Sequence, residues 1–294
     1  MIIVPGPASK DLGFRIANSM GIEAVPLEFK RFPDGESYFR FTKNLENEDV
    51  VIVQTTGPPQ DVNFLQLLLL IDAARDLGSK SVTAVVPYVA YGRQARRFLN
   101  GEAISSRTVF KLLETVDIDY FITFDYHNPE ILNYFKNHVE NLTAVPSLAK
   151  FMNGYSLKGA FSLAPDDGAI ELVKVASNIL EGDYGWLKKT RDKVTGEITI
   201  KVDNLNVKGK DAVVFDDIIS TGSTMTSAVK ILKSQGARRV YAACVHPLLI
   251  GDAKEKILRE GALEIVGTDC VPSPVSVVSV APVVAEALRR HFSM

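Results

Sequence analysis

The chain has 294 residues, of which 46% are hydrophobic and 23% charged, so it can bury the cores of about two ordinary globular domains. Its 33 Lys and Arg residues nearly balance its 35 Asp and Glu residues, and a net charge of −2 gives no overall field that would attract nucleic acid or an anionic membrane. The longest apolar stretch, FLQLLLLIDAA, is too short and interrupted to span a bilayer, and the first residues lack the basic flank and apolar segment of a signal peptide.

Apolar runs and helical patterns alternate along the first half of the chain. The β-branched runs at 50–55, 81–88 and 119–125 predict buried strands. The segments 61–80 and 105–116 have the periodicity of helices. This order of strand, helix and strand predicts a parallel sheet that is covered by helices on both faces.

The second half repeats this order of elements without a convincing sequence repeat. A hairpin of two short strands is expected over 185–201, and a helix from near Pro282 to the end of the sequence. The other expected elements, in chain order, are strand 161–168, helix 169–180, strand 211–217, helix 223–236, strand 238–247, helix 254–261 and strand 263–269.

These elements predict an α/β protein of two similar domains, each a mainly parallel sheet flanked by helices. We expect the first domain over 1–145 and the second over 146–280, with the C-terminal helix 281–294 packed back on the first domain. Cys244 and Cys270 are too few for a disulfide framework and form no CxxC metal motif. We therefore expect a reduced, cytoplasmic setting, with neither nucleic acid nor a membrane as a partner.

The stretch DAVVFDDIISTGSTMTSAVK (211–230) joins an apolar strand, two carboxylates, a loop of small residues and a helix. Ligands of open parallel sheets gather where a strand ends and a helix begins. Backbone N–H groups at a helix start, hydroxyls and a glycine that lets the backbone approach closely would bind a phosphate. Carboxylates would repel that phosphate but would accept hydrogen bonds from sugar hydroxyls. The predicted sugar-phosphate site consists of Asp216, Asp217, Ser220, Thr221, Gly222, Ser223 and Thr224.

An ordinary turn in which Asp217 caps the helix is the alternative to a sugar-phosphate site. The string nevertheless resembles the phosphoribosyl-pyrophosphate loop of the type I phosphoribosyltransferase fold. That fold serves transferases, which consume phosphoribosyl pyrophosphate, and ribose-phosphate pyrophosphokinases, which make it. Four further stretches resemble the pyrophosphokinases in the same order along nearly the whole chain: RFPDGESYFR (31–40), VPYVAYGRQARRFLNGEAISS (86–106), FDYHNPE (124–130) and APDDG (164–168).

The resemblance implies a ribose-phosphate diphosphokinase. Such an enzyme transfers the β,γ-diphosphoryl group of ATP to the anomeric hydroxyl of ribose 5-phosphate, giving 5-phosphoribosyl 1-pyrophosphate and AMP. In RFPDGE, Phe32 could stack on a base, and Asp34 and Glu36 could accept from an adenine amino group, although a Pro-Asp-Gly turn between two strands explains the same residues. In the family this loop lies over the adenine, often from the neighbouring subunit, which implies a homodimer with the adenine site at or near the subunit interface.

The remaining implied roles concern the triphosphate, the metal and the transfer step. Arg93 and Gln94 are implied ATP contacts in a basic, glycine-containing loop that could close on triphosphate. His127 is implied to reach the ATP phosphates or Mg²⁺, and Asp166 matches the magnesium carboxylate of the family. The catalytic pair implied by the hairpin is Lys189 and Arg191, with Lys188 as an alternate for Lys189. Without the resemblance, these residues would read as a solvated basic loop, a structural histidine and an exposed hairpin.

The sequence departs from the family pattern at two places. Ser220 stands where bacterial and animal relatives commonly carry Asp. Asn44 and Glu46 stand where many relatives carry Ser and Arg in a regulatory phosphate site, and a carboxylate there would repel phosphate. We therefore expect neither the usual phosphate activation and nucleotide inhibition nor the hexamer that goes with them, and a dimer instead.

Three other classes compete with this interpretation. A phosphoribosyltransferase would need a base-recognition hood and would need neither RFPDGE nor the basic hairpin. An inactive regulatory relative should have lost catalytic or metal residues, all of which are present. A sequence-specific nucleic-acid binder would not concentrate its basic residues in substrate loops.

Overall fold

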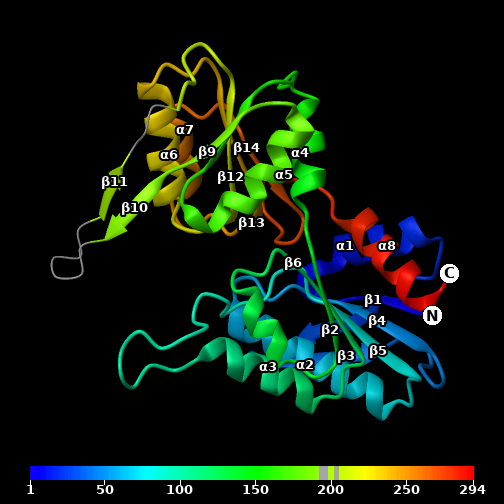
Figure 1. Ribbon diagram of the computed structural model, residues 1–294. Coiled ribbons are helices and arrows are strands. Elements are labelled where there is room, and N and C mark those ends of the chain that lie inside the picture. Colours follow the sequence, from blue (N-terminus) through cyan, green and yellow to red (C-terminus); the bar gives the residue numbers. More distant parts are fainter. Residues whose placement is uncertain (192–197, 202–204) are drawn as a thin grey trace. The chain divides into compact units, whose positions relative to one another are not determined.

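The computed structural model describes residues 1–191, 198–201 and 205–294. The chain divides into two compact units (Figure 1). The first unit comprises Met1–Thr143, Cys270–Pro272 and Ser279–Met294, and the second comprises Ala144–Asp269 and Ser273–Val278. The chain therefore leaves the first unit, builds the second, and returns to the first for its last helix.

The first unit is built on a parallel sheet in the order β1-β4-β5-β6-β7. The strand β4 shows why the sheet forms, since its Val50, Val51, Ile52 and Val53 are fully buried between helices on both faces. The strands are β1 (Ile2–Pro5), β4 (Asp49–Val53), β5 (Ser81–Val85), β6 (Tyr120–Phe124) and β7 (His138–Leu142).

Helices cover both faces of this first sheet, with α1 and α8 packed together on one face and α2 and α3 on the other (Figure 1). Their bounds are α1 (Lys10–Met20), α2 (Gln60–Asp76), α3 (Ser105–Thr115) and α8 (Ala281–Phe292), and the 3₁₀ helices are η1 (Pro7–Ser9) and η2 (Pro129–Tyr134). Arg290 of α8 forms an ion pair with Glu140 of β7 at 2.5 Å, and His291 stacks on Tyr120 with ring centroids 4.0 Å apart. The last helix is thus held to the first sheet by polar and aromatic contacts.

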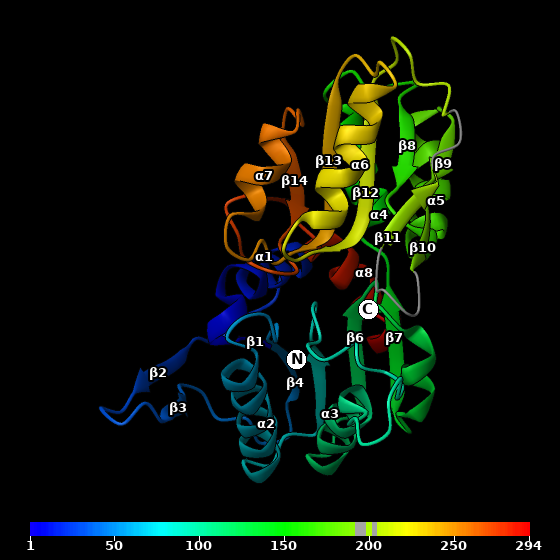
Figure 2. The ribbon, with the colours of Figure 1, turned by 90° about the vertical axis from the view of Figure 1, so that its left-hand side faces the viewer.

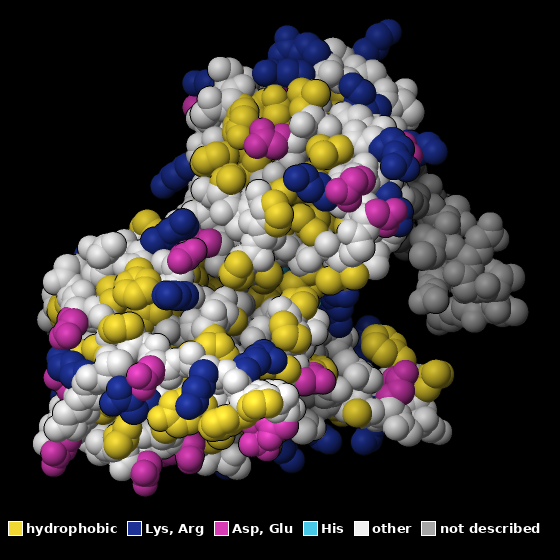
Figure 3. Space-filling view, turned by 180° about the vertical axis from the view of Figure 1, so that it is seen from behind, with side chains coloured by type: hydrophobic (Ala, Val, Ile, Leu, Met, Phe, Trp, Pro, Cys, Tyr) yellow, Lys and Arg dark blue, Asp and Glu magenta, His cyan; other side chains and the backbone are white. Residues whose placement is uncertain are grey.

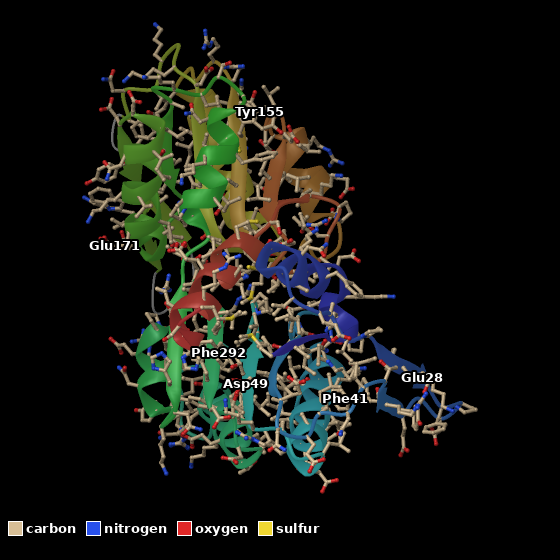
Figure 4. All side chains as sticks on the ribbon, turned by 90° about the vertical axis from the view of Figure 1, so that its right-hand side faces the viewer. Glu28, Phe41, Asp49, Tyr155, Glu171 and Phe292 are labelled. Carbon is tan, nitrogen blue, oxygen red and sulfur yellow. The ribbon has the colours of Figure 1, made fainter. Side chains whose placement is uncertain are left out.

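A hairpin of β2 (Leu27–Arg31) and β3 (Ser37–Phe41) projects from the first unit beside β1 (Figure 2). The rings of Phe29 and Phe39 stack at 5.3 Å, and Figure 4 shows Phe41 at the base of the hairpin and Glu28 farther out. A hairpin of this kind gains little stability from its own backbone pairing, so these ring contacts help to hold its shape.

The second unit has a parallel sheet in the order β15-β14-β13-β12-β8-β9. Helices α4 and α5 pack together on one face, and α6 and α7 on the other (Figure 1). The strands are β8 (Phe161–Ala164), β9 (Tyr184–Trp186), β12 (Ala212–Ile219), β13 (Val240–Pro247), β14 (Ile265–Thr268) and β15 (Ser276–Val278). The helices are α4 (Val145–Asn153), η3 (Asp167–Ala169), α5 (Ile170–Leu180), α6 (Ser223–Ser234) and α7 (Ala253–Arg259).

The strands β10 (Lys188–Arg191) and β11 (Ile198–Lys201) pair antiparallel and lie outside the main sheet of the second unit. This pair is the hairpin that the sequence predicts over 185–201. The predicted α/β class with parallel sheets flanked by helices is confirmed, as is the C-terminal helix.

Two predicted boundaries were wrong in ways that matter for the site. The strand predicted over 211–217 continues to Ile219, so Asp216 and Asp217 lie within β12 and not at its end. The strand predicted over 161–168 stops at Ala164, because Asp166 caps η3 by accepting from the Gly168 N–H at 3.1 Å.

Surface and hydropathy agree with the balanced composition. On the face drawn in Figure 3, hydrophobic side chains and charged side chains of both signs are interspersed over each unit. Among the residues that the structure describes, no helix combines the length and apolar character needed to cross a membrane.

Candidate active site

Three carboxylates lie toward the C-terminal ends of two neighbouring strands of the second sheet. Asp216 and Asp217 are on β12, and Asp166 follows β8, the strand that pairs with β12. Burial raises the pKa of Asp216 well above its usual range, and the negative charges of Asp217 and Asp166 raise it further. This edge therefore favours a cation, or hydroxyl groups that donate hydrogen bonds, because either relieves the crowding of negative charge.

The loop Ser220–Thr224 runs from the end of β12 into the first turn of α6, and some of its backbone donors are unpaired. Gly222 is the N-cap of α6 and has a φ of 76°, a left-handed conformation that suits glycine. Among the described residues, the backbone N–H groups of Thr221, Gly222 and Ser223 have no protein acceptor. The start of α6 adds the positive end of the helix dipole. Such a concentration of unpaired N–H groups is the usual environment of a bound phosphate.

The sugar-phosphate residues predicted from sequence thus occupy one continuous edge of the second unit. The loop offers donors to an anion, and the carboxylates of Asp216 and Asp217 stand next to it on β12. The backbone carbonyl of Ser220 accepts a hydrogen bond from the Ile250 N–H at 3.0 Å, in the connection that follows β13. Because Ser220 carries no carboxylate, Asp216 and Asp217 within β12 are the acidic side chains that precede the loop.

In the first unit, Arg93 and Gln94 lie between β5 and α3. Gln94 is held in place because its side-chain carbonyl accepts from the Ser105 hydroxyl at 2.8 Å and its backbone carbonyl accepts from the Ser106 N–H at 3.3 Å. Arg93 is exposed and forms no ion pair with any residue in the described part of the chain. A fixed glutamine beside a free guanidinium suits the binding of an external anion.

The other two arginines of this loop are engaged locally. The guanidinium of Arg96 lies over the ring of Phe98 at 4.8 Å, and Nε of Arg97 donates to the carbonyl of Glu102 at 2.8 Å. Arg93 is therefore the arginine of the loop that is available to a ligand.

His127 follows β6, near the Arg93 segment. The neighbouring Asn128 donates from Nδ2 to the Gly92 carbonyl at 2.7 Å, and Gly92 lies against the ring of Tyr126. Burial raises the pKa of Tyr126 to about 12, so this ring stays neutral. The hydrogen bond from Asn128 to Gly92 joins the loop after β5 to the loop after β6. His127 and Arg93, which flank this bond, are therefore held in neighbouring loops of the first unit.

The predicted adenine loop occupies the tip of the β2–β3 hairpin. The turn closes because the Phe32 N–H donates to the Glu36 carbonyl at 2.9 Å and the Glu36 N–H donates to Asp34 Oδ1 at 3.1 Å. Phe32 is 41% exposed, and Nζ of Lys30 lies 5.3 Å from its ring centroid. The hairpin lies beside the edge strand β1 (Figure 2), whereas Arg93 and His127 follow β5 and β6. The predicted ATP residues of a single chain are therefore at two separate places of the first unit.

The predicted catalytic pair is on β10, where Lys189 pairs with Ile200 and Arg191 with Ile198 of β11. The side chains of both residues lie outside the described part of the structure. Lys188 precedes this pair as the first residue of β10 and pairs with Lys201 of β11.

Sequence reasoning missed the residues that support these loops. Asn128 lies within the FDYHNPE motif, but its role depends on a contact with Gly92 that no local pattern indicates. Leu249 and Ile250 likewise act through backbone groups, which leave no signal in the identity of a side chain.

The two sheets, with a phosphate-type loop after β12, define a protein of the phosphoribosyltransferase-like class. The model of the phosphoribosyl transferase domain matches residues 135–283, and the model of the N-terminal domain of ribose phosphate pyrophosphokinase matches residues 1–116. The chain belongs to the ribose-phosphate pyrophosphokinase family, and the resemblance expected from its motifs is confirmed.

Individual relatives agree with this assignment over nearly their full length. The ribose-phosphate pyrophosphokinase of Saccharolobus solfataricus is 40% identical over 272 residues, covering 92% of this chain and 93% of its own. That of Methanosarcina acetivorans is 41% identical over 294 residues, covering 99% of this chain and 100% of its own. The crystal structure of phosphoribosylpyrophosphate synthetase from Mycobacterium smegmatis matches with a TM-score of 0.88 at 27% identity, covering 99% of this chain and 98% of that one.

Proposed function

We propose that the protein transfers the β,γ-diphosphoryl group of ATP to the anomeric hydroxyl of ribose 5-phosphate. The observation that carries this proposal is the joint presence of unpaired loop N–H groups and adjacent carboxylates after and along β12. A sugar phosphate satisfies both, because its phosphate accepts from the loop while its hydroxyls donate to the carboxylates. The bond from the anomeric oxygen to the β-phosphorus forms, and the bond from that phosphorus to the oxygen it shares with the α-phosphate breaks. The proton of the anomeric hydroxyl is released to solvent, and AMP leaves.

The chain supplies positioning and charge to this reaction, and no covalent nucleophile is required. The loop Ser220–Thr224 binds the 5-phosphate, and Asp216 and Asp217 accept from the ribose hydroxyls. Lys189 and Arg191 neutralise the negative charge that builds up as AMP departs. The residues that contact ATP are Phe32, Asp34, Glu36, Arg93, Gln94 and His127.

Mg²⁺ is the metal that fits these residues. Among the described side chains, no three or more His, Cys, Asp or Glu residues are placed to hold a metal ion by themselves. Mg²⁺ commonly takes only one or two protein carboxylates and completes its shell with phosphate oxygens and water. Asp166, which adds to the negative charge around Asp216, and His127 would hold it. When bound, the ion would neutralise the charge of the ATP phosphates.

The position of the adenine loop supports a homodimer. Because Phe32 lies on a hairpin that projects beside β1, away from Arg93 and His127, the tip is suited to reach the ATP site of a second copy. A groove of about 460 Å³ beside the hairpin, lined in part by Phe29 and Arg31, offers further surface to that copy. The adenine site would then lie at the subunit interface.

Regulation by phosphate at the segment after β3 is not part of this proposal. Asn44 Oδ1 accepts from the Glu46 N–H at 3.1 Å, and Glu46 packs near Gly78. The carboxylate of Glu46 would repel a phosphate at this place. Cys244 and Cys270 are buried free thiols, which suits a reducing compartment, and we place the reaction in the cytoplasm.

Product analysis tests the proposed reaction. The protein is mixed with MgATP and ribose 5-phosphate, and the products are separated by nucleotide chromatography and identified by phosphorus NMR. AMP formed one-for-one with a new sugar pyrophosphate is the expected result. ADP would indicate ordinary kinase chemistry and overturn the proposal. Absence of turnover together with tight binding of phosphoribosyl pyrophosphate would favour a transferase or a regulatory relative.

A further inference from the structure

The connection between β13 and α7, residues 248–252, lies against the phosphate loop. The Leu249 N–H donates to the Ile219 carbonyl at 3.0 Å, and the Ile250 N–H donates to the Ser220 carbonyl at 3.0 Å. These two bonds join the end of β12 to a segment about thirty residues later in the chain. They involve backbone atoms alone, so they depend on the path of the connection and not on its side chains.

The planarity of the peptide bond turns these contacts into a constraint on the phosphate loop. In a trans peptide the carbonyl of one residue and the N–H of the next point in opposite directions. When Ile250 fixes the Ser220 carbonyl, it also aims the Thr221 N–H away from the connection. Leu249 aims the Ser220 N–H in the same way through the Ile219 carbonyl.

We propose that residues 248–252 act as a clamp that positions the phosphate loop for ribose 5-phosphate. The clamp orients the N–H groups of Ser220 and Thr221 before the ligand arrives. Binding therefore does not have to offset the entropy cost of ordering the loop. This inference rests on the proposed function, because it assigns the loop to the 5-phosphate. Leu249 and Ile250 are positioning residues, since they act on the ligand only through the loop.

The backbone of Leu249 supports this role. Its φ is 46°, in the left-handed region that a branched side chain rarely adopts. Its side chain packs against the core of the second unit, which holds the residue in this conformation. Strained backbone of this kind persists where the surroundings fix it, and it gathers at functional sites.

A second contact restricts the phosphate loop, because Gly222 packs closely against α7. A Cβ atom built on Gly222 would lie 3.1 Å from the Cβ of Ala253 and 3.2 Å from the Cδ1 of Ile257. The loop therefore lies directly on the first turn of α7, the helix that the connection leads into. Backbone bonds at one end and this close packing at the other leave the loop little freedom to move.

The test removes single backbone N–H groups from the full-length protein. Replacing Leu249 or Ile250 by its α-hydroxy acid turns the amide into an ester and deletes the donor while keeping the side chain. The matched control is the same replacement at Leu263, whose N–H donates to the Val240 carbonyl at 2.8 Å in the same unit, away from the loop. The readouts are the dissociation constant of ribose 5-phosphate by calorimetry, both KM values, kcat and the melting temperature.

We expect the ester at Ile250 or Leu249 to raise the KM and the dissociation constant for ribose 5-phosphate about tenfold, with kcat and the KM for ATP within about twofold. The Leu263 ester should lower the melting temperature similarly and leave ribose 5-phosphate binding unchanged. Equal binding by all three esters would overturn the clamp while the wild-type protein still binds the sugar phosphate. A wild-type protein that does not bind ribose 5-phosphate would overturn both the proposed function and the clamp.

Discussion

The side chain of Asn128 donates a 2.7 Å hydrogen bond to the carbonyl oxygen of Gly92, and so joins the loop after β6 to the loop after β5. His127 precedes the donor and Arg93 follows the acceptor. Replacing Asn128→Ala should let these loops move apart and raise the KM for ATP several-fold, with no change in the affinity for ribose 5-phosphate. Steady-state kinetics with each substrate varied measure this effect. The control is Asn133→Ala, an exposed asparagine in η2, and an equal effect of both variants would contradict the role of Asn128.

Arg93 and Arg96 provide a matched pair for the ATP site. Arg93 has no ion-pair partner among the described residues, whereas Arg96 rests on the ring of Phe98. Arg93→Ala should raise the KM for ATP about tenfold, because a charge-assisted contact with phosphate is lost. Arg96→Ala should change it less than about threefold, in line with an exposed cation–π contact. A larger effect at Arg96 would show that the loop rearranges when ATP binds.

The effect of close packing at Gly222 can be distinguished from the effect of its backbone conformation by comparison with Gly209, which has a similar φ but no close neighbour. Gly222 has a φ of 76° and little room for a Cβ, whereas Gly209 has a φ of 74° and nothing within 4 Å of a built Cβ. Gly222→Ala and Gly209→Ala should each cost about 1 kcal/mol of unfolding free energy from the left-handed conformation. Only Gly222→Ala should also weaken ribose 5-phosphate binding, by displacing the loop from Ala253. Denaturant unfolding and calorimetry on both variants check this, and normal binding by Gly222→Ala would refute it.

The hairpin of β10 and β11 carries the predicted catalytic lysine. Lys189→Ala should lower kcat by about 100-fold or more, with little change in the affinity for ribose 5-phosphate, because its charge acts on the departing AMP. Lys188→Ala, at the neighbouring position of the same strand, should have a much smaller effect. Single-turnover kinetics with AMP release as the readout compare the two. The reverse order of effects would transfer the catalytic role to Lys188.

The contact of His291 with Tyr120 predicts a pH dependence of stability. Burial lowers the pKa of His291, and the nearby His138 lowers it further. Three nearby carboxylates act in the opposite direction and raise the pKa of His291: Glu140, Asp119 and Asp49. Because the folded pKa is below the unfolded value of about 6.5, the stability contribution of neutral His291 is complete above that pH and is lost as the pH falls through the folded pKa.

Thermal unfolding between pH 8 and pH 5 tests this contribution. His291→Phe keeps a ring on Tyr120 but cannot take up a proton. The melting temperature of the wild-type protein should therefore fall more steeply with decreasing pH than that of the variant. Parallel curves for the two proteins would mean that His291 makes no pH-dependent contribution.

The sequence was most informative where one local property decides the structure. The uninterrupted β-branched run VVIV predicted β4, and periodic apolar residues predicted α3 and α6. The short strand β15 was not predicted, and residues 185 and 186 of β9 were assigned to the hairpin expected over 185–201, since three residues carry no usable pattern and their pairing depends on neighbours. The extension of β12 past Asp217 was missed because aspartate is uncommon in strands, and here the pairing of Ile218 with His246 overrides that preference.

The same distinction applies to the candidate site. The loop with Gly222 and the motif with Arg93 are contiguous in sequence, so each could be interpreted from its own residues. The clamp at Leu249 and the bridge from Asn128 to Gly92 are contacts between separate segments, made largely by backbone atoms. Such contacts follow from the packing of whole elements, and side-chain identity alone does not indicate them.

The return of α8 to the first unit has a consequence for the order in which the protein can mature on the ribosome. Residues Ala281–Phe292 pack against α1, which is made from Lys10–Met20, so the first unit is complete only after the whole second unit has been translated. The sheet of the second unit has all its strands translated by Val278. The unit whose translation begins first is therefore the one that receives its final helix last.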